Sequence, residues 1–316
     1  MTSIAIQSGI RNRANRVSSI WKEMKKAWVA YVYISPFYFI FAIFGAFPLL
    51  YSLYLSFQMW TGHGPMLFVG LGNYEFLLQD RLFWVALWNT VVIWIAAHIP
   101  MLFVALVLAY ILNSGLVRFR RFFETIYFTP MVTSTVAVAF VFMTMYGFRF
   151  GLINFGLKSI GLPAIDWWGG SGFWIKPAII ILFIWRWTGW NMVIYLAGMQ
   201  GIDPELIDAA KVDGAKHSQI FLYITLPLLK PVILFTLILS FVGGITIFDE
   251  PYLLTWMQTL GGTNYSGLTL SLYLYNEGFV REHLGYAAAI AYVVSAIILI
   301  LSIFNLKLFG KPPSAA

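Results

Sequence analysis

The sequence predicts an all-α integral membrane protein with six transmembrane helices. Of its 316 residues, 60% are hydrophobic and 10% are charged, so the chain cannot cover itself with the polar surface of a soluble protein. Six apolar segments reach the ~20 residues that a helix needs to cross a bilayer core. Apolar and polar residues do not alternate with the period of two that a membrane β-barrel requires, whereas helices satisfy their own backbone groups in lipid.

The six spans are expected at residues 27–57, 84–112, 122–146, 177–200, 221–247 and 285–308. They make residues 27–308 one transmembrane domain, with a basic segment before it at 1–26 and a short tail after it at 309–316. The first apolar segment is longer than the core of a signal peptide, and no small-residue cleavage site follows it. We therefore expect this segment to be retained as a membrane anchor.

A polar segment at residues 203–227 separates the fourth and fifth spans. Its Asp-Pro start at 203–204 predicts a helix, because aspartate caps free N–H groups and proline is favoured in the first turn. Ala209 and Ala210 then give a surface that another protein can approach closely. Gly214 allows a turn that a residue with a Cβ would strain. The sequence predicts a compact helix and turn between two spans.

The basic residues predict the orientation of the chain. Most of the 20 Lys and Arg residues lie before the first span, after the second, after the fourth and after the sixth. By the positive-inside rule, both termini and the segment 203–227 face the cytoplasm. The net charge of +7 follows from this bias and from attraction to anionic lipid, so it requires no nucleic acid partner.

The sequence lacks the residues needed for disulfides, for metal sites and for binding ATP. The chain has no cysteine, which excludes disulfides and thiolate metal sites. Its four histidines are scattered without ligand spacing, so we expect no metal site. No Gly-x4-Gly-Lys-Ser/Thr phosphate-binding loop occurs, and we expect no cofactor in this chain. If ATP drives its function, ATP and Mg²⁺ bind to another polypeptide, and this chain is a non-catalytic subunit.

The polar segment also carries a recognisable motif. Residues 208–215 read Asp-Ala-Ala-Lys-Val-Asp-Gly-Ala, and after eight intervening residues, 224–227 read Ile-Thr-Leu-Pro. This pattern resembles the cytoplasmic signature loop of ABC importer permeases, with Asp208 where that family usually has glutamate. The resemblance implies the ABC type I importer permease fold and a coupling helix that fits into a groove of an ATPase subunit. The residues expected at this contact are Glu205, Asp208, Ala209, Ala210, Asp213, Gly214 and Ala215.

Further segments extend the resemblance over most of the chain. Residues 68–74, 127–130, 151–154 and 248–262 look like parts of carbohydrate permeases of the maltose, lactose and glycerol-phosphate type, in the first-permease form. The resemblance implies a second homologous permease subunit, two ATPase subunits and an extracytoplasmic solute-binding protein as partners. It also implies a sugar substrate and a place in the lipid of a bacterial or archaeal cell (inner) membrane.

The fourth and fifth spans have the composition of a sugar site. A sugar has apolar C–H faces and a rim of hydroxyls, which suit aromatic rings and a few amide or hydroxyl groups. Trp187, Trp190 and Asn191 lie within about one helical turn, and Ser240 begins a small-residue stretch in the fifth span. With the positions implied by the resemblance, the expected substrate-binding residues are Trp187, Gly189, Trp190, Asn191, Met192, Ser240, Gly243, Gly244 and Ile247.

Packing is the alternative for each of these residues. Trp is enriched at membrane interfaces and small residues at helix contacts. Arg186 differs, because a charge inside a span is costly and by default suggests function. It could pair with Asp249, with Glu250 or with a partner subunit, and we favour an ion pair or a gate over direct contact with sugar.

Three other functions stay open at this point. The chain could carry another polar solute, such as glycerol 3-phosphate. An ion-coupled secondary transporter would need more ionisable groups in its spans and often internal repeats, which are not evident. A membrane-embedded enzyme would need nucleophiles or metal ligands grouped around one cavity, and the sequence shows no such group.

Overall fold

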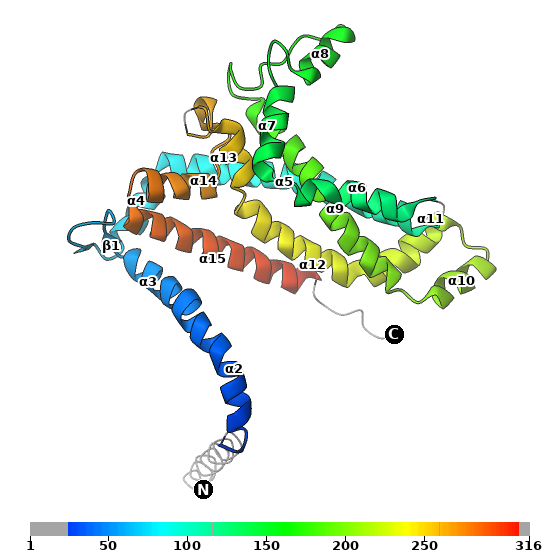
Figure 1. Ribbon diagram of the computed structural model, residues 1–316, viewed down its shortest axis with the longest axis horizontal. Helices are drawn as coiled ribbons and strands as arrows, with labels where there is room; N and C mark the ends of the chain where they lie inside the picture. The colour runs from blue at the N-terminus through cyan, green and yellow to red at the C-terminus, as the bar shows by residue number, and fades with distance from the viewer. Residues whose placement is uncertain (1–24, 116, 259, 310–316) are drawn as a thin grey trace, which may run out of the picture. The chain divides into compact units, whose positions relative to one another are not determined.

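Figure 1 shows the computed structural model of the chain, which describes residues 25–115, 117–258 and 260–309. Most of the expected basic segment, residues 1–24, and of the expected tail, residues 310–316, lies outside the described residues. The chain divides into two compact units, Met1–Leu55 and Ser56–Ala316. The candidate functional site lies entirely in the second unit.

The first unit contains one long apolar helix. It is made of α2 (Trp28–Phe41), the π-helical turn η1 (Ala42–Ala46) and α3 (Phe47–Leu55). Pro48 explains the π-helical turn, because proline has no N–H to continue the regular ladder; the N–H of Phe47 donates instead to the carbonyl of Ala42. An 18-residue window within Trp28–Leu55 has a mean hydropathy of 1.8, and the 28 residues are long enough to cross a bilayer.

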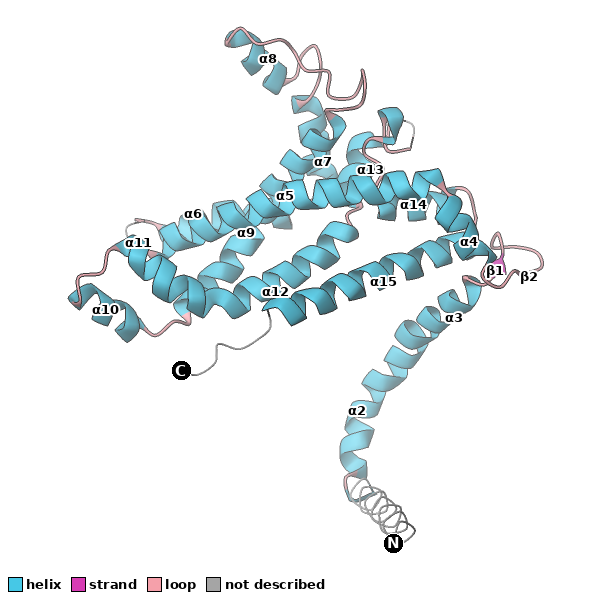
Figure 2. Ribbon diagram, turned by 180° about the vertical axis from the view of Figure 1, so that it is seen from behind, coloured by secondary structure: helices cyan, strands magenta, loops and turns pink. Residues whose placement is uncertain are grey.

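Four long helices form the body of the second unit: α5 (Arg81–Asn113), α9 (Ile175–Gln200), α12 (Leu226–Ile245) and α15 (Leu284–Phe309). They run lengthwise beside one another in both Figure 1 and Figure 2. Helix α5 packs against α9, and α12 contacts α5, α9 and α15. Buried apolar side chains join them, such as Ile93 of α5 with Ile179 and Leu182 of α9. These helices correspond to the second, fourth, fifth and sixth predicted spans.

The third predicted span is not a single straight helix. It consists of α6 (Arg120–Val132) and α7 (Thr135–Met145), which meet at an angle of 94°. Thr133 at the break has extended backbone with ψ 147°, and the hydroxyls of Thr129 and Thr133 donate to carbonyls four residues earlier. Such bonds compete with the helix and bend it. Among the described residues, five helices are long and apolar enough to span a membrane, or six with this bent pair.

The polar segment between α9 and α12 forms a helix and turn as predicted. It contains α10 (Pro204–Val212), α11 (His217–Ile220) and the π-helical turn η2 (Phe221–Thr225), which leads into α12. Figure 2 shows α10 and α11 at one end of the second unit, and the hairpin of residues 58–68 with α4 (Gly72–Gln79) at the other. The position of Pro227 in the first turn of α12 explains the irregular turn before it.

The remaining elements of the second unit are short. They are β1 (Gln58–Met59) paired antiparallel with β2 (Leu67–Phe68), α4 (Gly72–Gln79), α8 (Leu152–Ser159), α13 (Asp249–Thr255), the 3₁₀ turn η3 (Thr263–Tyr265), α14 (Leu270–Tyr275) and the π-helical turn η4 (Asn276–Val280). Three residues separate the end of α12 from the start of α13, and after this break Glu250 lies within hydrogen-bond distance of Arg186 in α9.

Asp80 joins several of these elements. One of its carboxylate oxygens caps the start of α5 by accepting from the N–H of Leu82 at 2.9 Å. The other accepts from the hydroxyls of Tyr273 in α14 and Tyr286 in α15. Burial raises the pKa of Tyr273 above its usual value, and the bond to Asp80 raises it further. The tyrosine hydroxyl therefore stays protonated as a donor, and the three helices are held together at this end.

Candidate functional site

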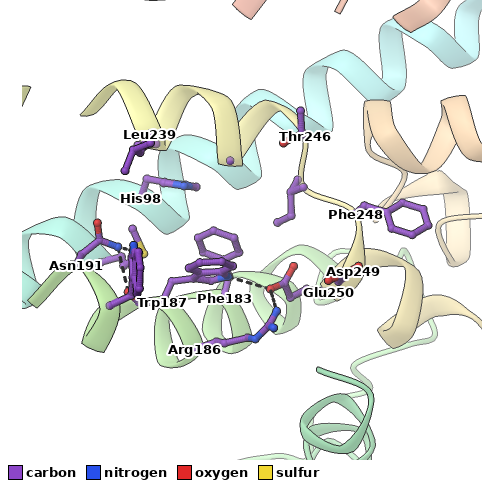
Figure 3. A pocket seen from close by; sticks show the side chains of 15 residues that line it. His98, Phe183, Arg186, Trp187, Asn191, Leu239, Thr246, Phe248, Asp249 and Glu250 are labelled. Atoms are coloured by element: carbon purple, nitrogen blue, oxygen red, sulfur yellow. Dashed lines mark hydrogen bonds and ion pairs between the residues drawn. The ribbon is translucent and has the colours of Figure 1, made fainter. Parts of the chain in front are cut away.

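A cavity of about 320 Å³ lies between α5, α9, α12 and the start of α13 (Figure 3). Its volume lies at the lower end of the range typical of small-molecule sites. The lining residues are His98 and Met101 from α5; Phe183, Arg186, Trp187, Trp190 and Asn191 from α9; Leu239, Ser240 and Gly243 from α12; and Thr246, Ile247, Phe248, Asp249 and Glu250 from the following turn and α13.

Aromatic rings form one wall of the cavity. The rings of Phe183 and Trp187, one turn apart on α9, stack with their centroids 5.9 Å apart and an angle of 29° between planes. His98 from α5 lies against Phe183, with the ring centroids 4.7 Å apart. Trp190 also lines the cavity and has Phe128 of α6 behind it, at 6.0 Å. Such flat faces can stack on the C–H face of a sugar ring.

A buried ion pair forms the wall nearest α13. Arg186 Nη1 donates to Glu250 Oε1 at 3.1 Å, and the two side chains are 10% and 4% exposed. The indole N–H of Trp187 donates to the same oxygen, also at 3.1 Å, and Arg186 Nη2 donates to Thr135 Oγ1 of α7. Figure 3 shows Arg186 and Trp187 reaching from α9 toward Glu250. Of the pairings considered for Arg186, the one with Glu250 is therefore present.

The polar groups of the cavity are held by neighbouring helices. Asn191 Nδ2 donates to the carbonyl of Trp187 at 3.0 Å, which directs its amide along the cavity wall and leaves its side-chain oxygen as the acceptor for a solute. Ser240 Oγ accepts from the indole N–H of Trp94 at 3.1 Å, so its own hydroxyl hydrogen remains to donate. The cavity thus offers amide and hydroxyl partners beside aromatic faces.

Six of the nine predicted substrate residues line this cavity: Trp187, Trp190, Asn191, Ser240, Gly243 and Ile247. The structure places the other three at helix contacts. A Cβ on Gly189 would collide with the carbonyl oxygen of Tyr127 in α6, and one on Gly244 would collide with the ring of Trp94. Met192 is fully buried among residues of α5 and α9. Contact between a solute and any of the nine stays a prediction.

Several lining residues were not among those nine. His98 and Met101 come from α5, about 90 positions before α9 in the chain, and no local pattern links them to it. Glu250 was considered as a partner of Arg186, but not as a residue of the cavity. Phe183 could have been found from the sequence, because it stands four residues before Trp187 and therefore shares its helix face.

Helix α10 forms a second candidate functional surface. Asp203 caps it by accepting from the N–H of Glu205 at 3.0 Å. Gly214 ends the turn with φ +79°, the left-handed conformation that strains other residues, and the N–H of Ala215 donates to the carbonyl of Ala210 at 2.9 Å. The chain therefore leaves the helix abruptly and returns to α12.

All seven predicted coupling residues lie on α10 or its turn. Ala210 and Ala215 are partly exposed, and the other five, Glu205, Asp208, Ala209, Asp213 and Gly214, are exposed. Asp208 pairs with Lys211 at 2.8 Å, but both side chains are more than half exposed, so the pair adds little stability. Val212 was not predicted, although it is 88% exposed. An apolar side chain with this exposure beside two alanines suits contact with another protein.

The chain is similar to known proteins over most of its length. Residues 76–308 match the family described as the inner membrane component of binding-protein-dependent transport systems. The lactose transport system permease protein LacF of Rhizobium radiobacter is 41% identical over 86% of this chain and 91% of its own length. The arabinooligosaccharides transport system permease protein AraP of Bacillus subtilis is 38% identical, with 92% of each chain covered.

A solved structure has the same fold. A chain of a bacterial ABC transporter involved in the import of the acidic polysaccharide alginate superposes with a TM-score of 0.80 and 25% sequence identity. The match covers 94% of this chain and 100% of that one.

Proposed function

The chain belongs to the family of inner membrane components of binding-protein-dependent transport systems, and we propose that it carries a sugar into the cytoplasm as a subunit of an ATP-driven importer. It is a membrane-spanning permease subunit with the fold of ABC importer permeases. We infer that the sugar is an oligosaccharide, because two relatives are named for the transport of lactose and of arabinooligosaccharides.

The lining of the cavity is the observation that carries the sugar assignment. Trp187 and Trp190 offer stacking faces, and Asn191 and Ser240 offer an amide and a hydroxyl, around about 320 Å³ of space. Sugar recognition needs this combination of flat apolar surface and a few directed polar groups. Arg186, the Lys or Arg residue of the lining, forms an ion pair with Glu250. The groups that remain to bind a solute are therefore uncharged partners for hydroxyls.

The exposed helix α10 supports a coupling role. Because the sequence contains no phosphate-binding loop of the Gly-x4-Gly-Lys-Ser/Thr type, ATP and Mg²⁺ would bind to partner ATPases that dock on Ala209, Ala210 and Val212. The further partners are a second homologous permease subunit and an extracytoplasmic solute-binding protein. The positive-inside bias places both termini and α10 in the cytoplasm, in a bacterial or archaeal cell membrane.

The connection between α10 and the cavity suggests a route for alternating access. Helix α10 connects directly to α9 and, through α11 and η2, to α12, and these two long helices carry most of the cavity lining. A rigid displacement of α10 by the ATPases would therefore move two walls of the cavity against α5. Such a movement can open the cavity first outward and then inward.

Sugar uptake by cells that lack this gene tests the proposal. Complementation with the wild-type gene should restore uptake of labelled lactose or arabinooligosaccharide, or of another member of a neutral oligosaccharide panel. Gly214→Val should not restore it, because valine strains a turn with φ +79° on the coupling surface. Gly161→Val is the matched control, since Gly161 has φ +80° and equally open surroundings at the end of α8.

Two results would contradict the proposal. Uptake with Gly214→Val at the wild-type rate would show that α10 does not couple to an energy source. Full uptake of every sugar in the panel by cells without the gene would show that the chain does not import them. Equal loss in Gly161→Val would assign the defect to strain in general rather than to α10.

A further inference from the structure

We propose that the cavity selects uncharged saccharides and rejects those bearing a carboxylate, sulfonate or phosphate, and that Glu250 and Asp249 set this preference. The inference rests on the proposed function, because it names the class of sugar that the same cavity accepts. The proposed substrate differs in charge from that of the solved relative, whose transporter is involved in the import of an acidic polysaccharide. The shared fold therefore leaves the charge of the substrate open, and the lining of the cavity decides it.

The positive charge of the lining is already neutralised. Arg186 is the only Lys or Arg among the lining residues, and its Nη1 lies 3.1 Å from Glu250 Oε1. Both side chains are at least nine-tenths buried, and the indole N–H of Trp187 holds the same carboxylate oxygen in place. Arg186 Nε has no hydrogen-bond partner, but an anionic sugar that displaced Glu250 from Arg186 Nη1 would leave a buried carboxylate without its cationic partner. Breaking a buried pair in this way is strongly unfavourable.

Asp249 adds a further negative charge at the cavity. It lines the cavity beside Glu250, as Figure 3 shows, and its side chain is exposed. Arg186, Glu250 and Asp249 together give the lining one positive and two negative charges, a net charge of −1 when His98 is neutral. His98 is 5% exposed and its Nδ1 faces the carbonyl of Trp94 at 3.0 Å rather than a carboxylate, and burial without a counter-charge favours the neutral ring.

An anionic sugar would therefore enter a cavity whose lining has a net negative charge. Like charges brought close together weaken binding and so raise the dissociation constant. A neutral saccharide is not repelled by these carboxylates. Its hydroxyls can donate to the side-chain oxygen of Asn191 and accept from Ser240, and its ring can stack on Trp187.

Matched sugar pairs test the proposal. Digalactose and digalacturonate differ only in the exchange of hydroxymethyl groups for carboxylates, and cellobiose with its uronic acid counterpart gives a second pair. Binding of the labelled sugars is measured on the transporter complex purified through this chain and placed in lipid nanodiscs. The solute-binding protein is omitted so that its own selectivity does not enter. We expect the neutral member to bind at least about tenfold more tightly in each pair that binds.

Two variants locate the origin of the preference. Glu250→Gln leaves the charge of Arg186 free and should reduce the preference for the neutral sugar at least about tenfold. Asp249→Asn removes an exposed charge without breaking the buried pair, and should reduce it about threefold. If Glu250→Gln fails to assemble, Asp249→Asn still tests whether the carboxylates of the cavity set the preference. Glu75→Gln, which removes an exposed charge on α4 outside the cavity, should leave the preference unchanged.

The outcomes separate this inference from the proposed function. Equal or tighter binding of the acidic sugars by the wild-type complex overturns the inference and leaves sugar transport standing. An unchanged preference in the cavity variants that assemble also overturns it, since the discrimination would then arise elsewhere. Binding of no sugar of either charge contradicts the assignment of the cavity to sugars, and the inference fails with it.

Discussion

Gly189 and Gly243 are both glycines at the predicted substrate site, and the structure assigns them opposite responses to the same substitution. A Cβ on Gly189 would overlap the carbonyl oxygen of Tyr127 and lie within 3.0 Å of Phe128 N. These are backbone atoms of α6, which cannot turn aside as a flexible side chain would. A Cβ on Gly243 meets no atom within 4 Å and points into open space. Gly189→Ala should therefore push α6 away from α9, whereas Gly243→Ala should leave the packing intact.

The expected difference in stability is large. Overpacking a close contact costs about 1–3 kcal/mol, and the overlap at Gly189 is with backbone, so we expect the upper end of that range. Alanine in place of a helical glycine gains up to about 1 kcal/mol where space allows, as at Gly243. The two variants should thus differ by about 3–4 kcal/mol. A change of this size lowers a midpoint of thermal unfolding by roughly 5 °C or more in a chain of this length.

Thermal unfolding of the purified variants in detergent gives the measurement, with the fraction that remains monodisperse after heating as the readout. Gly243→Ala should match or slightly exceed the wild type in stability but lower sugar uptake, because its methyl group takes space from the cavity. Gly189→Ala should lower both. Equal thermal stability of the two variants would refute the packing role of Gly189 and return it to the candidates for direct contact with sugar.

Three further outcomes are expected. Asn89→Leu should destabilise the protein by about 2–3 kcal/mol in the same unfolding assay, because the buried Asn89 donates through Nδ2 to the carbonyl of Tyr265 and to the buried carbonyl of Leu268; an unchanged midpoint would contradict this. In the cysteine-free chain, Lys216→Cys should react with membrane-impermeant maleimide only in opened cells, and labelling of intact cells would reverse the predicted topology. Ala210→Trp should insert normally but abolish sugar-stimulated ATP hydrolysis, and normal coupling would exclude docking on α10.

The sequence predicts the long helices well because their signal is local. Five of the six predicted spans appear among the described residues as helices long enough to cross a membrane, and the Asp-Pro start and Gly214 within the motif define α10 and its turn as expected. The break at Thr133 was not predicted, because threonines occur both in straight membrane helices and at bends. Its geometry depends on where α7 can pack, which no local pattern contains.

The substrate site could be predicted only in part. The helix faces of Trp187, Trp190 and Asn191 follow from their spacing, and these residues do line the cavity. Glycine, however, suits both an open cavity and a tight helix contact, so the sequence could not separate Gly243 from Gly189 and Gly244. The α5 wall depends on contacts between distant segments, which a single sequence does not reveal.

Sugar uptake into proteoliposomes tests most directly whether this cavity carries the solute of an ATP-driven importer. The purified complex would be reconstituted with ATP inside and the solute-binding protein outside, and labelled sugar counted over time. The wild type should accumulate sugar only with ATP. Trp187→Ala loses a stacking surface worth about 1 kcal/mol, so its uptake should fall about fivefold.

Trp88→Ala supplies the control, because Trp88 lies on α5 with 67% of its surface exposed and does not line the cavity. Its uptake should match that of the wild type. ATP-dependent accumulation that is lost selectively in Trp187→Ala is the predicted result. Accumulation that needs no ATP, or that proceeds in Trp187→Ala at the wild-type rate and with the wild-type choice of sugar, would contradict it.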